Sequence, residues 1–408
     1  MSLNPVALPE DLVPEILARL PAKSLLRFRC VSKQWKALIG SQYFVNLQLK
    51  ISKARAQDNP QILLMINNNH GTRPSFLIVS PDSPPQKMRP THLPFTELRS
   101  LVRRIHGCCN GLVCLSNSLT DHIVLWNPTI RKRWVLPVPV LDDACHHPPI
   151  LTHSTIYSTY EYAFGYDDIG DDYKVVGILA CFDSSSTSSP PRPIHQEVKV
   201  YSVASNSWRR LPLNFQYIVG TRGISRTEGK LVNNALHWKA IDDGGCDCIV
   251  ALDLNAETTR IFAPPPNDVE SVQSIWDVGV FEDFLCVIYM HSTKSASASL
   301  WIMKDYGLND SWTKITVVEP HPNILQRMYG PFYKRLSCEL NLIPYLGRRS
   351  NEIFFHDDIN VYAYDTVTHL VRPTDLPITK DGRLFQPSGF PLITSLVEPW
   401  SRHVVPAM

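Results

Sequence analysis

The chain has 408 residues, of which 44% are hydrophobic and 19% charged, and its formal net charge is +2. This composition is ordinary for a globular protein, and the length allows a small module plus one large domain, or two medium domains. No run of about 18 apolar residues occurs, so we expect no transmembrane helix and no membrane partner. The first residues lack a basic stretch followed by an apolar one, which predicts no secretory signal and a location in the cytoplasm or nucleus.

The ten cysteines and fourteen histidines follow no metal-binding pattern. No pair of CxxC elements is present, and in a reducing compartment we expect the cysteines to be buried or free thiols. Cys145, His146 and His147 are adjacent, and three adjacent side chains do not easily converge on one ion, so we predict a solvated loop there. We therefore expect no metal and no cofactor.

Residues 8–49 are rich in leucine and valine and predict three short helices. Asp11 is a candidate N-cap of the first helix, which Pro21 ends. Ser24 is a candidate cap of the second helix and Ser32 of the third. A segment of about 40 residues rarely buries so much apolar surface alone, so we expect part of it to meet another protein.

This segment resembles the F-box, a family whose three helices dock onto the Skp-type adaptor of Skp–cullin–F-box ubiquitin ligases. The family pattern is matched in order and without gaps. The resemblance implies these adaptor-binding residues: Leu8, Pro9, Leu12, Ile16, Leu17, Leu20, Pro21, Leu25, Leu26, Val31, Trp35, Leu38 and Ile39. The alternative is an ordinary N-terminal helical hairpin packed on the next domain. We expect residues around Tyr43, Phe44 and Leu47 to pack back and orient that domain.

The charge is distributed unevenly along the chain. Residues 1–55 contain nine Lys/Arg and three acidic residues, whereas the remainder contains 31 Lys/Arg and 35 acidic residues. A basic helical module could bind nucleic acid, but the basic residues form no continuous run and no nucleic-acid motif accompanies them. An acidic protein partner fits as well, and the F-box resemblance favours it, so we expect no nucleic-acid partner.

From about residue 60 the pattern changes to short strands separated by turns. One unit recurs, consisting of a strand, a polar turn and a second strand, often followed by Leu-Pro, and another pair of strands precedes each copy. The copies are 123–137, 198–212, 249–266, 299–318 and 359–377. Four strands in about 50 to 75 residues approach the spacing of kelch-type propeller blades. Strands at 62–66 and 76–79 begin a further unit, which a strand around 392–397 would complete, closing the ring.

The fold class we predict is α+β overall: a small N-terminal three-helix F-box, then an all-β, kelch-like propeller. The propeller is expected to have six blades, with seven as the alternative. The predicted domains are the F-box in 1–50, a linker in 51–60 and the propeller in 61–400.

The second half also resembles the F-box-associated domain of the large plant families of F-box/kelch-repeat type. The segments that carry the resemblance are 107–112, 125–129, 164–167, 172–176, 200–202, 207–209, 236–238 and 250–254. Kelch blades carry a Gly-Gly doublet on their second strand, whereas the only doublet here, Gly244-Gly245, falls in a polar loop. Kelch is therefore an architectural analogy.

Several conspicuous motifs have structural explanations. Asn110-Gly111 and Asn127-Pro128 are predicted turn formers. The acidic segment 167–172 lacks the EF-hand pattern, so we expect a solvated hairpin rather than a calcium site. Core positions between neighbouring blades are predicted for the tryptophans that recur in the units: Trp126, Trp208, Trp238, Trp301 and Trp312.

Together the resemblances imply a non-catalytic substrate-recognition subunit of a ubiquitin ligase. The F-box would hold the Skp-type adaptor and, through it, the cullin, and the propeller would hold a protein substrate for ubiquitylation and degradation. The alternative is an enzyme or a small-molecule-dependent receptor that uses the propeller pocket, although no HExxH, GxSxG, P-loop or GxGxxG with suitable flanks is present. The substrate-binding residues are not identified. Candidate contact segments are 142–155, 184–194, 242–247 and 320–333.

Overall fold

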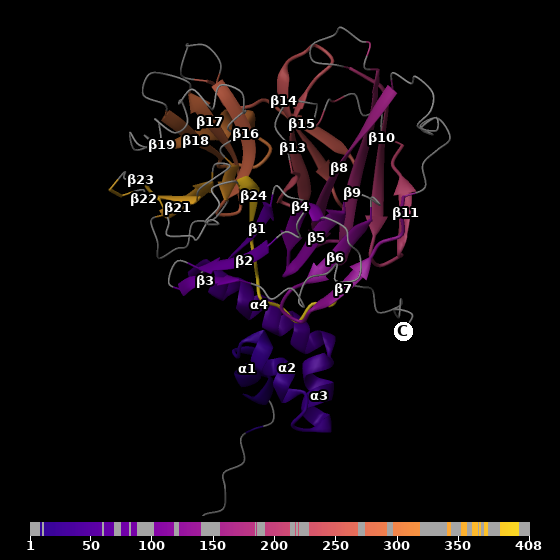
Figure 1. The fold of residues 1–408 in the computed structure, drawn as a ribbon, viewed down its shortest axis with the longest axis vertical. Coiled ribbons are helices and arrows are strands. Elements are labelled where there is room, and N and C mark those ends of the chain that lie inside the picture. The colour runs from indigo at the N-terminus through magenta and orange to yellow at the C-terminus, as the bar shows by residue number, and fades with distance from the viewer. Residues whose placement is uncertain are drawn as a thin grey trace, which may run out of the picture.

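A computed structural model places four helices at one end of the molecule and the β-sheets at the other (Figure 1). It describes residues 9, 12–58, 61–68, 75–80, 83–87, 102–117, 122–139, 156–183, 185, 192–212, 217, 219, 228–267, 274–291, 297–318, 341–343, 352–356, 361–365, 367–368, 371–373 and 384–399. Within these ranges, no helix is long and apolar enough to cross a membrane.

Three short helices open the described chain: α1 (Leu12–Ala18), α2 (Ala22–Phe28) and α3 (Lys33–Gly40). The predicted cap of the third helix is confirmed, because the Ser32 hydroxyl accepts a hydrogen bond from the Trp35 N–H at 3.0 Å. The predicted cap of the second helix is wrong. Ser24 lies inside α2, whose N-cap is Pro21, a residue whose ring fixes φ at a value suited to helix initiation. Asp11 lies outside the described residues.

A fourth helix, α4 (Gln42–Asp58), follows at once and was not predicted. The Ser41 hydroxyl accepts a hydrogen bond from the Phe44 N–H at 3.2 Å, as an N-cap does. Phe44 packs into the core that α1–α3 share, whereas Leu49 packs against the sheets. Because the apolar residues of α4 serve two partners, they form no single stripe that sequence periodicity would reveal.

The described strands form six four-stranded antiparallel sheets. The strands of each sheet are given in spatial order. The first sheet contains β24 (Leu384–Pro391), β1 (Ile62–Asn68), β2 (Ser75–Ser80) and β3 (Ser83–Lys87), and the second contains β4 (Val102–Cys109), β5 (Leu112–Asn117), β6 (Ile123–Asn127) and β7 (Lys132–Val135). The third contains β8 (Ile156–Asp167), β9 (Asp172–Asp183), β10 (Pro193–Ser202) and β11 (Ser207–Arg210). The other three contain β12 (Lys230–Val232), β13 (Ala235–Ile241), β14 (Asp247–Asp253), β15 (Thr259–Phe262); β16 (Ser274–Phe281), β17 (Phe284–His291), β18 (Ser297–Met303), β19 (Trp312–Val318); and β20 (Asn341–Ile343), β21 (Glu352–His356), β22 (Val361–Asp365), β23 (Val371–Pro373). The sheets surround a common centre, as in a β-propeller (Figure 1).

The sheet that contains β1 takes its fourth strand from the C-terminal part of the chain. β24 pairs antiparallel with β1, Leu63 lying opposite Phe390. The prediction that a late strand completes this sheet is confirmed, but the predicted residues, 392–397, are wrong. The strand ends at Pro391, and residues 392–399 leave the sheet and run to the helices.

The recurring tryptophans pack within and between sheets, as predicted. Three of them, Trp126, Trp238 and Trp301, are buried. The other two are half-buried on outer strands, and each indole N–H donates to a backbone carbonyl of the preceding sheet. Trp208 on β11 reaches the Pro137 oxygen at 2.6 Å, and Trp312 on β19 reaches the Ala263 oxygen at 3.0 Å. Trp208 and Trp312 therefore each join their own sheet to the preceding one.

The acidic turn between β8 and β9 is not simply a solvated hairpin, so that prediction is wrong for two of its four carboxylates. Asp167 is 1% exposed and accepts hydrogen bonds from Asn234 Nδ2 and Lys174 Nζ, both at 3.0 Å. Asp172 is also buried, whereas Asp168 and Asp171 are exposed. The sequence shows the acidic run, but not the neighbouring sheet that supplies Asn234.

Burial lowers the pKa of His237 to about 4. The ring lies on β13, with Nδ1 3.1 Å from the Lys230 carbonyl and Nε2 2.9 Å from the Tyr306 hydroxyl. An unfolded histidine takes up a proton near pH 6.5, so acidification from pH 6.5 towards 4 favours the unfolded chain by up to about 1.4 kcal/mol per pH unit.

We therefore predict that His237→Gln lowers stability at pH 7.5 but flattens its decline between pH 6.5 and 4. Urea unfolding of both proteins across this range measures the two slopes. Equal slopes would contradict the prediction.

Candidate functional site

Twelve of the thirteen predicted adaptor-binding residues are described, and they divide into an exposed, a half-buried and a buried group. The exposed group contains Pro9, Leu12, Ile16, Pro21 and Val31. The half-buried group contains Leu20, Leu26, Trp35 and Leu38. The buried group contains Leu17, Leu25 and Ile39. Leu8 lies outside the described residues.

The buried group builds the helical module. Leu17, Leu25 and Ile39 are at most 3% exposed and share one core with Phe44 of α4 and Leu396 of the C-terminal segment. Burial of a leucine side chain contributes about 1.5–3 kcal/mol. These residues can therefore serve a partner only by holding the helices in place.

The exposed group is available to a partner directly. Leu12 is 44%, Ile16 48% and Val31 63% exposed. Leu12 and Ile16 are four residues apart and lie on one face of α1, opposite Leu17. Large apolar side chains grouped at one exposed face are typical of a protein-binding surface.

Residues 392–399, which we call the strap, join the helices to the sheets. Leu396 belongs to the helical core and its neighbour Val397 to the core of the β4–β7 and β8–β11 sheets. On the helical side, buried Gln48 of α4 donates to the Thr394 carbonyl and accepts from the Leu396 N–H, both at 3.3 Å. The side-chain amide of Gln48 thus forms the hydrogen bonds with the strap's backbone that a neighbouring strand would otherwise form.

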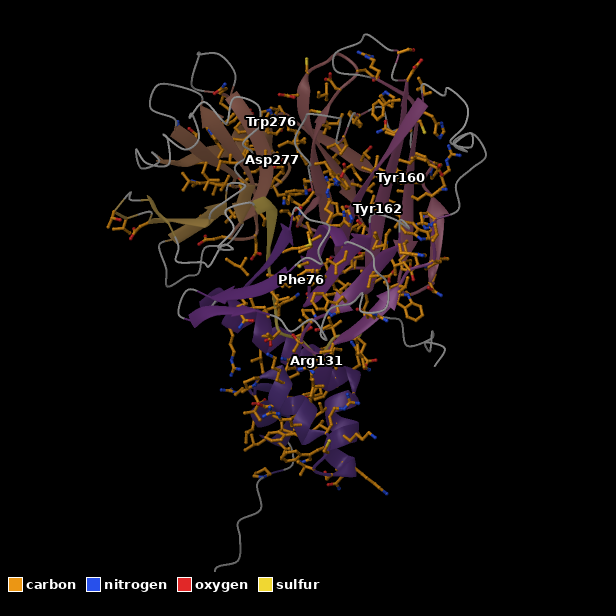
Figure 2. All side chains as sticks on the ribbon, in the orientation of Figure 1. Phe76, Arg131, Tyr160, Tyr162, Trp276 and Asp277 are labelled. Carbon is orange, nitrogen blue, oxygen red and sulfur yellow. The ribbon has the colours of Figure 1, made fainter. Side chains whose placement is uncertain are left out.

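On the sheet side, Asn127 holds the strap. Its Oδ1 accepts from the Thr129 N–H at 2.8 Å, as predicted for a turn former, while its Nδ2 donates to the carbonyls of Ser395 at 3.2 Å and Val397 at 2.8 Å. Arg131, in the same turn, lies at the junction with the helices (Figure 2). The sequence did not reveal the contact between Asn127 and the strap.

The Asn110-Gly111 turn approaches the strap from the same side. Both residues have positive φ, 51° and 83°, which confirms the predicted turn. A Cβ on Gly111 would lie 2.3 Å from the Ser395 hydroxyl oxygen, so only glycine fits. The Ser395 hydroxyl donates to the Asn110 carbonyl at 2.7 Å, which fixes the strap against this turn.

Of the residues predicted to orient the large domain, Phe44 and Leu47 pack on the helical core and Tyr43 is 65% exposed. Leu49 contacts the sheets, and Val45 contacts both the sheets and the helical core. A cleft of about 600 Å³ remains beside this contact, lined by parts of α2–α4, the strap and the turns of the two nearest sheets. The junction is therefore a packed contact with one hollow beside it.

Charged side chains on and beside the first strands of three neighbouring sheets form ion pairs. Arg104 on β4 pairs with Glu161 on β8, and Lys230 lies 3.3 Å from Glu228. Burial raises the pKa of Glu228 and of Asp277, which lies on β16 beside Trp276 (Figure 2). Among the residues that the structure describes, no group of three His, Cys, Asp or Glu side chains could hold a metal ion. The Cys145–His147 motif and three of the four candidate substrate segments lie wholly or largely outside that part of the chain.

Comparison with known proteins assigns both parts of the chain. Residues 7–47 match the model of the F-box domain, and residues 61–357 match that of the F-box associated beta propeller domain. The chain belongs to the plant F-box proteins with an F-box-associated β-propeller.

Its relatives in Arabidopsis thaliana extend along most of this F-box protein. F-box protein CPR1 is 30% identical over 353 residues, which cover 82% of this chain and 80% of the relative. F-box protein At4g22390 is 28% identical, covering 81% and 78%, and F-box/kelch-repeat protein At3g23880 is 29% identical, covering 76% and 79%. The similarity therefore extends over about three quarters or more of each chain.

Asn127→Asp tests the strap contact. We predict a loss of about 2–3 kcal/mol in unfolding free energy, because a carboxylate would replace an amide donor and face two carbonyl oxygens. Asn206→Asp is the matched control. Asn206 also lies in a turn, with a positive φ of 50°, and its Oδ1 accepts from the Tyr201 hydroxyl, which a carboxylate can also do. Unlike Asn206, Asn127 is not among the residues with positive φ. Thermal unfolding of both variants measures the difference, and equal losses would contradict the role of Asn127.

Proposed function

We propose that this F-box protein is the substrate-recognition subunit of a Skp–cullin–F-box ubiquitin ligase. Its F-box binds the Skp-type adaptor and, through it, the cullin, while its propeller binds a protein substrate for ubiquitylation and degradation. The observation that carries the proposal is a set of exposed apolar side chains, Leu12 and Ile16 on one face of α1 and Val31 after α2, on a module whose core is filled by its own helices and Leu396. Such a subunit would work in the cytoplasm or nucleus.

The proposed mechanism is positional and needs no catalytic side chain in this chain. A substrate held on the propeller shares one assembly with the ubiquitin-conjugating enzyme, so its lysines meet that enzyme at a raised effective concentration. The packed strap supports this, because it holds the propeller against the F-box.

We also propose that the six sheets are six blades of one closed ring. The first strands touch at five of the six junctions between successive sheets: β24 touches β4, β4 touches β8, β8 touches β12, β12 touches β16, and β20 touches β24. β24 takes the first position in its sheet, so the C-terminal part of the chain closes the ring. With this ring, the division we propose is the F-box in 1–50, a connection in 51–60 and a propeller in 61–400. The helix α4 crosses the first of these boundaries, because it begins at Gln42 and ends at Asp58.

The substrate is proposed to bind at the end of the propeller remote from the F-box. β9 begins at Asp172, which lines the cleft beside the helices, and ends at Asp183. At about 3.3 Å per residue this strand carries the chain about 36 Å away. Two candidate contact segments, 184–194 and 242–247, follow strands at that far end.

Leu12→Asp combined with Ile16→Asp tests the adaptor role. We predict that the double variant no longer co-purifies with a Skp-type adaptor and a cullin, while its thermal unfolding changes by less than about 0.5 kcal/mol because both side chains are exposed. Val135→Asp, at 49% exposure on the propeller, is the matched control and should retain both partners.

Leu17→Asp is expected to unfold the F-box, so a loss of adaptor binding in that variant would not distinguish a lost contact from a lost fold. Capture of neither partner by the unmodified chain, or retention of both by the double variant, would reject the proposal. For trapping a substrate, the double variant is also preferable to an F-box deletion, because a deletion would remove the residues that pack against Leu396.

A further inference from the structure

The cleft between the helices and the sheets is large enough to hold a small organic molecule. Its volume is about 600 Å³, and ligand sites commonly measure about 300–1,000 Å³ and lie between domains. The ends of α2 and α3, α4, the strap and the turns of the β4–β7 and β8–β11 sheets form its walls. Arg131, which lies between two lining residues, marks its place in Figure 2. No residue of α1 lines it, so the cleft is separate from the exposed face of Leu12 and Ile16.

Each wall of the cleft contributes apolar side chains. Ile39 comes from α3, and Leu396 and Val397 come from the strap. Ile130 and Val203 come from the turns of the two sheets. A lining of this kind can bury the apolar body of a ligand, while a few polar groups fix its orientation.

One charged side chain in the cleft differs from the others. Four of the five charged residues that line it have partners in the described chain: Lys132 with Glu398, Asp171 with Tyr166 and Asp172 with Ser202. The fifth is Arg29, which is half-buried at the C-cap of α2. Its guanidinium forms no ion pair or hydrogen bond with the part of the chain that the structure describes.

The surroundings of Arg29 favour a cation without giving it a direct partner. A Cβ on Gly40 would lie 4.0 Å from Arg29 Nη2, so the guanidinium lies beside the end of α3. A cation at the C-terminus of a helix gains typically about 0.3–1 kcal/mol. A guanidinium partly withdrawn from water gains more from an anion, because it binds a carboxylate or a phosphate through two parallel hydrogen bonds.

We propose that the cleft binds a small organic acid, with its carboxylate or phosphate on Arg29 and its apolar body against Ile130, Val203 and Val397. The acidic residues of the cleft lie on the sheets and the strap, which places the anion on the helical side. A ligand held in this way contacts the helices, the strap and both sheets, so its binding stabilises the junction. The inference goes beyond the proposed function and does not depend on it.

The probes for this site share one apolar body and differ in charge. 1-Naphthoate carries a carboxylate, 1-naphthyl phosphate carries a phosphate, and 1-naphthylmethanol is neutral. Their binding to the full chain is measured by titration with saturation-transfer difference NMR, which detects weak ligands. We expect saturable binding of at least one anion, and binding of the neutral probe that is weaker by about tenfold or more, since a hydrogen bond to a charged group contributes about 1.5–3 kcal/mol.

Arg29→Gln tests the anion contact. We expect it to weaken binding of the anionic probe about tenfold or more and to leave the neutral probe within about twofold. The matched control is Arg27→Gln, which removes the same charge from an exposed position of α2 that does not line the cleft. This control should leave the binding of every probe within about twofold.

Ala204→Trp tests the position of the site and leaves Arg29 in place. Ala204 is exposed and lines the cleft, so an indole there occupies the space of the ligand. We expect binding of all three probes to weaken about tenfold or more. Ser205→Trp is the matched control, because Ser205 is the next residue and is also exposed but does not line the cleft. Thermal unfolding of each variant shows that its fold is kept.

Three results would overturn the inference. If neither anion binds saturably to the unmodified chain, the cleft does not hold an organic acid. Equal losses with Arg29→Gln and Arg27→Gln, or with Ala204→Trp and Ser205→Trp, place the binding elsewhere. Equal affinity for the neutral probe and the anions makes the cleft an apolar cavity in which Arg29 has no role. All three results leave the proposed adaptor role standing.

Discussion

The rest of the structure depends on the burial of the strap between α4 and the β4–β7 sheet. The chain first adds β24 to the sheet of β1 and then crosses to the helices, where Leu396 and Val397 enter two different cores. Without this segment both cores would lack a side chain, and Gln48 and Asn127 would be left with buried polar groups unpaired. β24 and the strap that follows it therefore complete, in one stretch of chain, a β-sheet, the helical core and the contact between the helices and the sheets.

Because the strap is buried in this way, the F-box and the propeller are joined by a packed junction. α4 contributes because its opposite sides meet different partners, Phe44 the helices and Leu49 the sheets. The short helices, which carry the exposed side chains of Leu12 and Ile16, lie at the end away from the propeller (Figure 1). The loops best placed to read a substrate lie at the other end, beyond strands such as β9. A receptor built this way would control where a substrate lies rather than how it reacts.

Features that depend on local pattern were predictable from the sequence, whereas features that depend on distant contacts were not. The strand pairs of each sheet, the Ser32 cap and the Asn110-Gly111 turn follow from nearby residues, and all are present. The F-box pattern could not separate core from surface, since exposed Ile16 and buried Leu17 are adjacent apolar residues of the same motif. The hydrogen bond between Asn127 and Val397 joins residues 270 positions apart in the sequence, so no local sequence pattern predicts it.

The central claim is that the F-box and the propeller move as one rigid body. Two exposed free cysteines, Cys30 after α2 and Cys246 before β14, allow dyes to be placed on the two parts once Cys145 and Cys338 are replaced by serine. Single-molecule energy transfer between these dyes measures their separation in freely diffusing protein. A rigid junction predicts one narrow transfer-efficiency peak. A broad distribution, or several interconverting peaks, would contradict it.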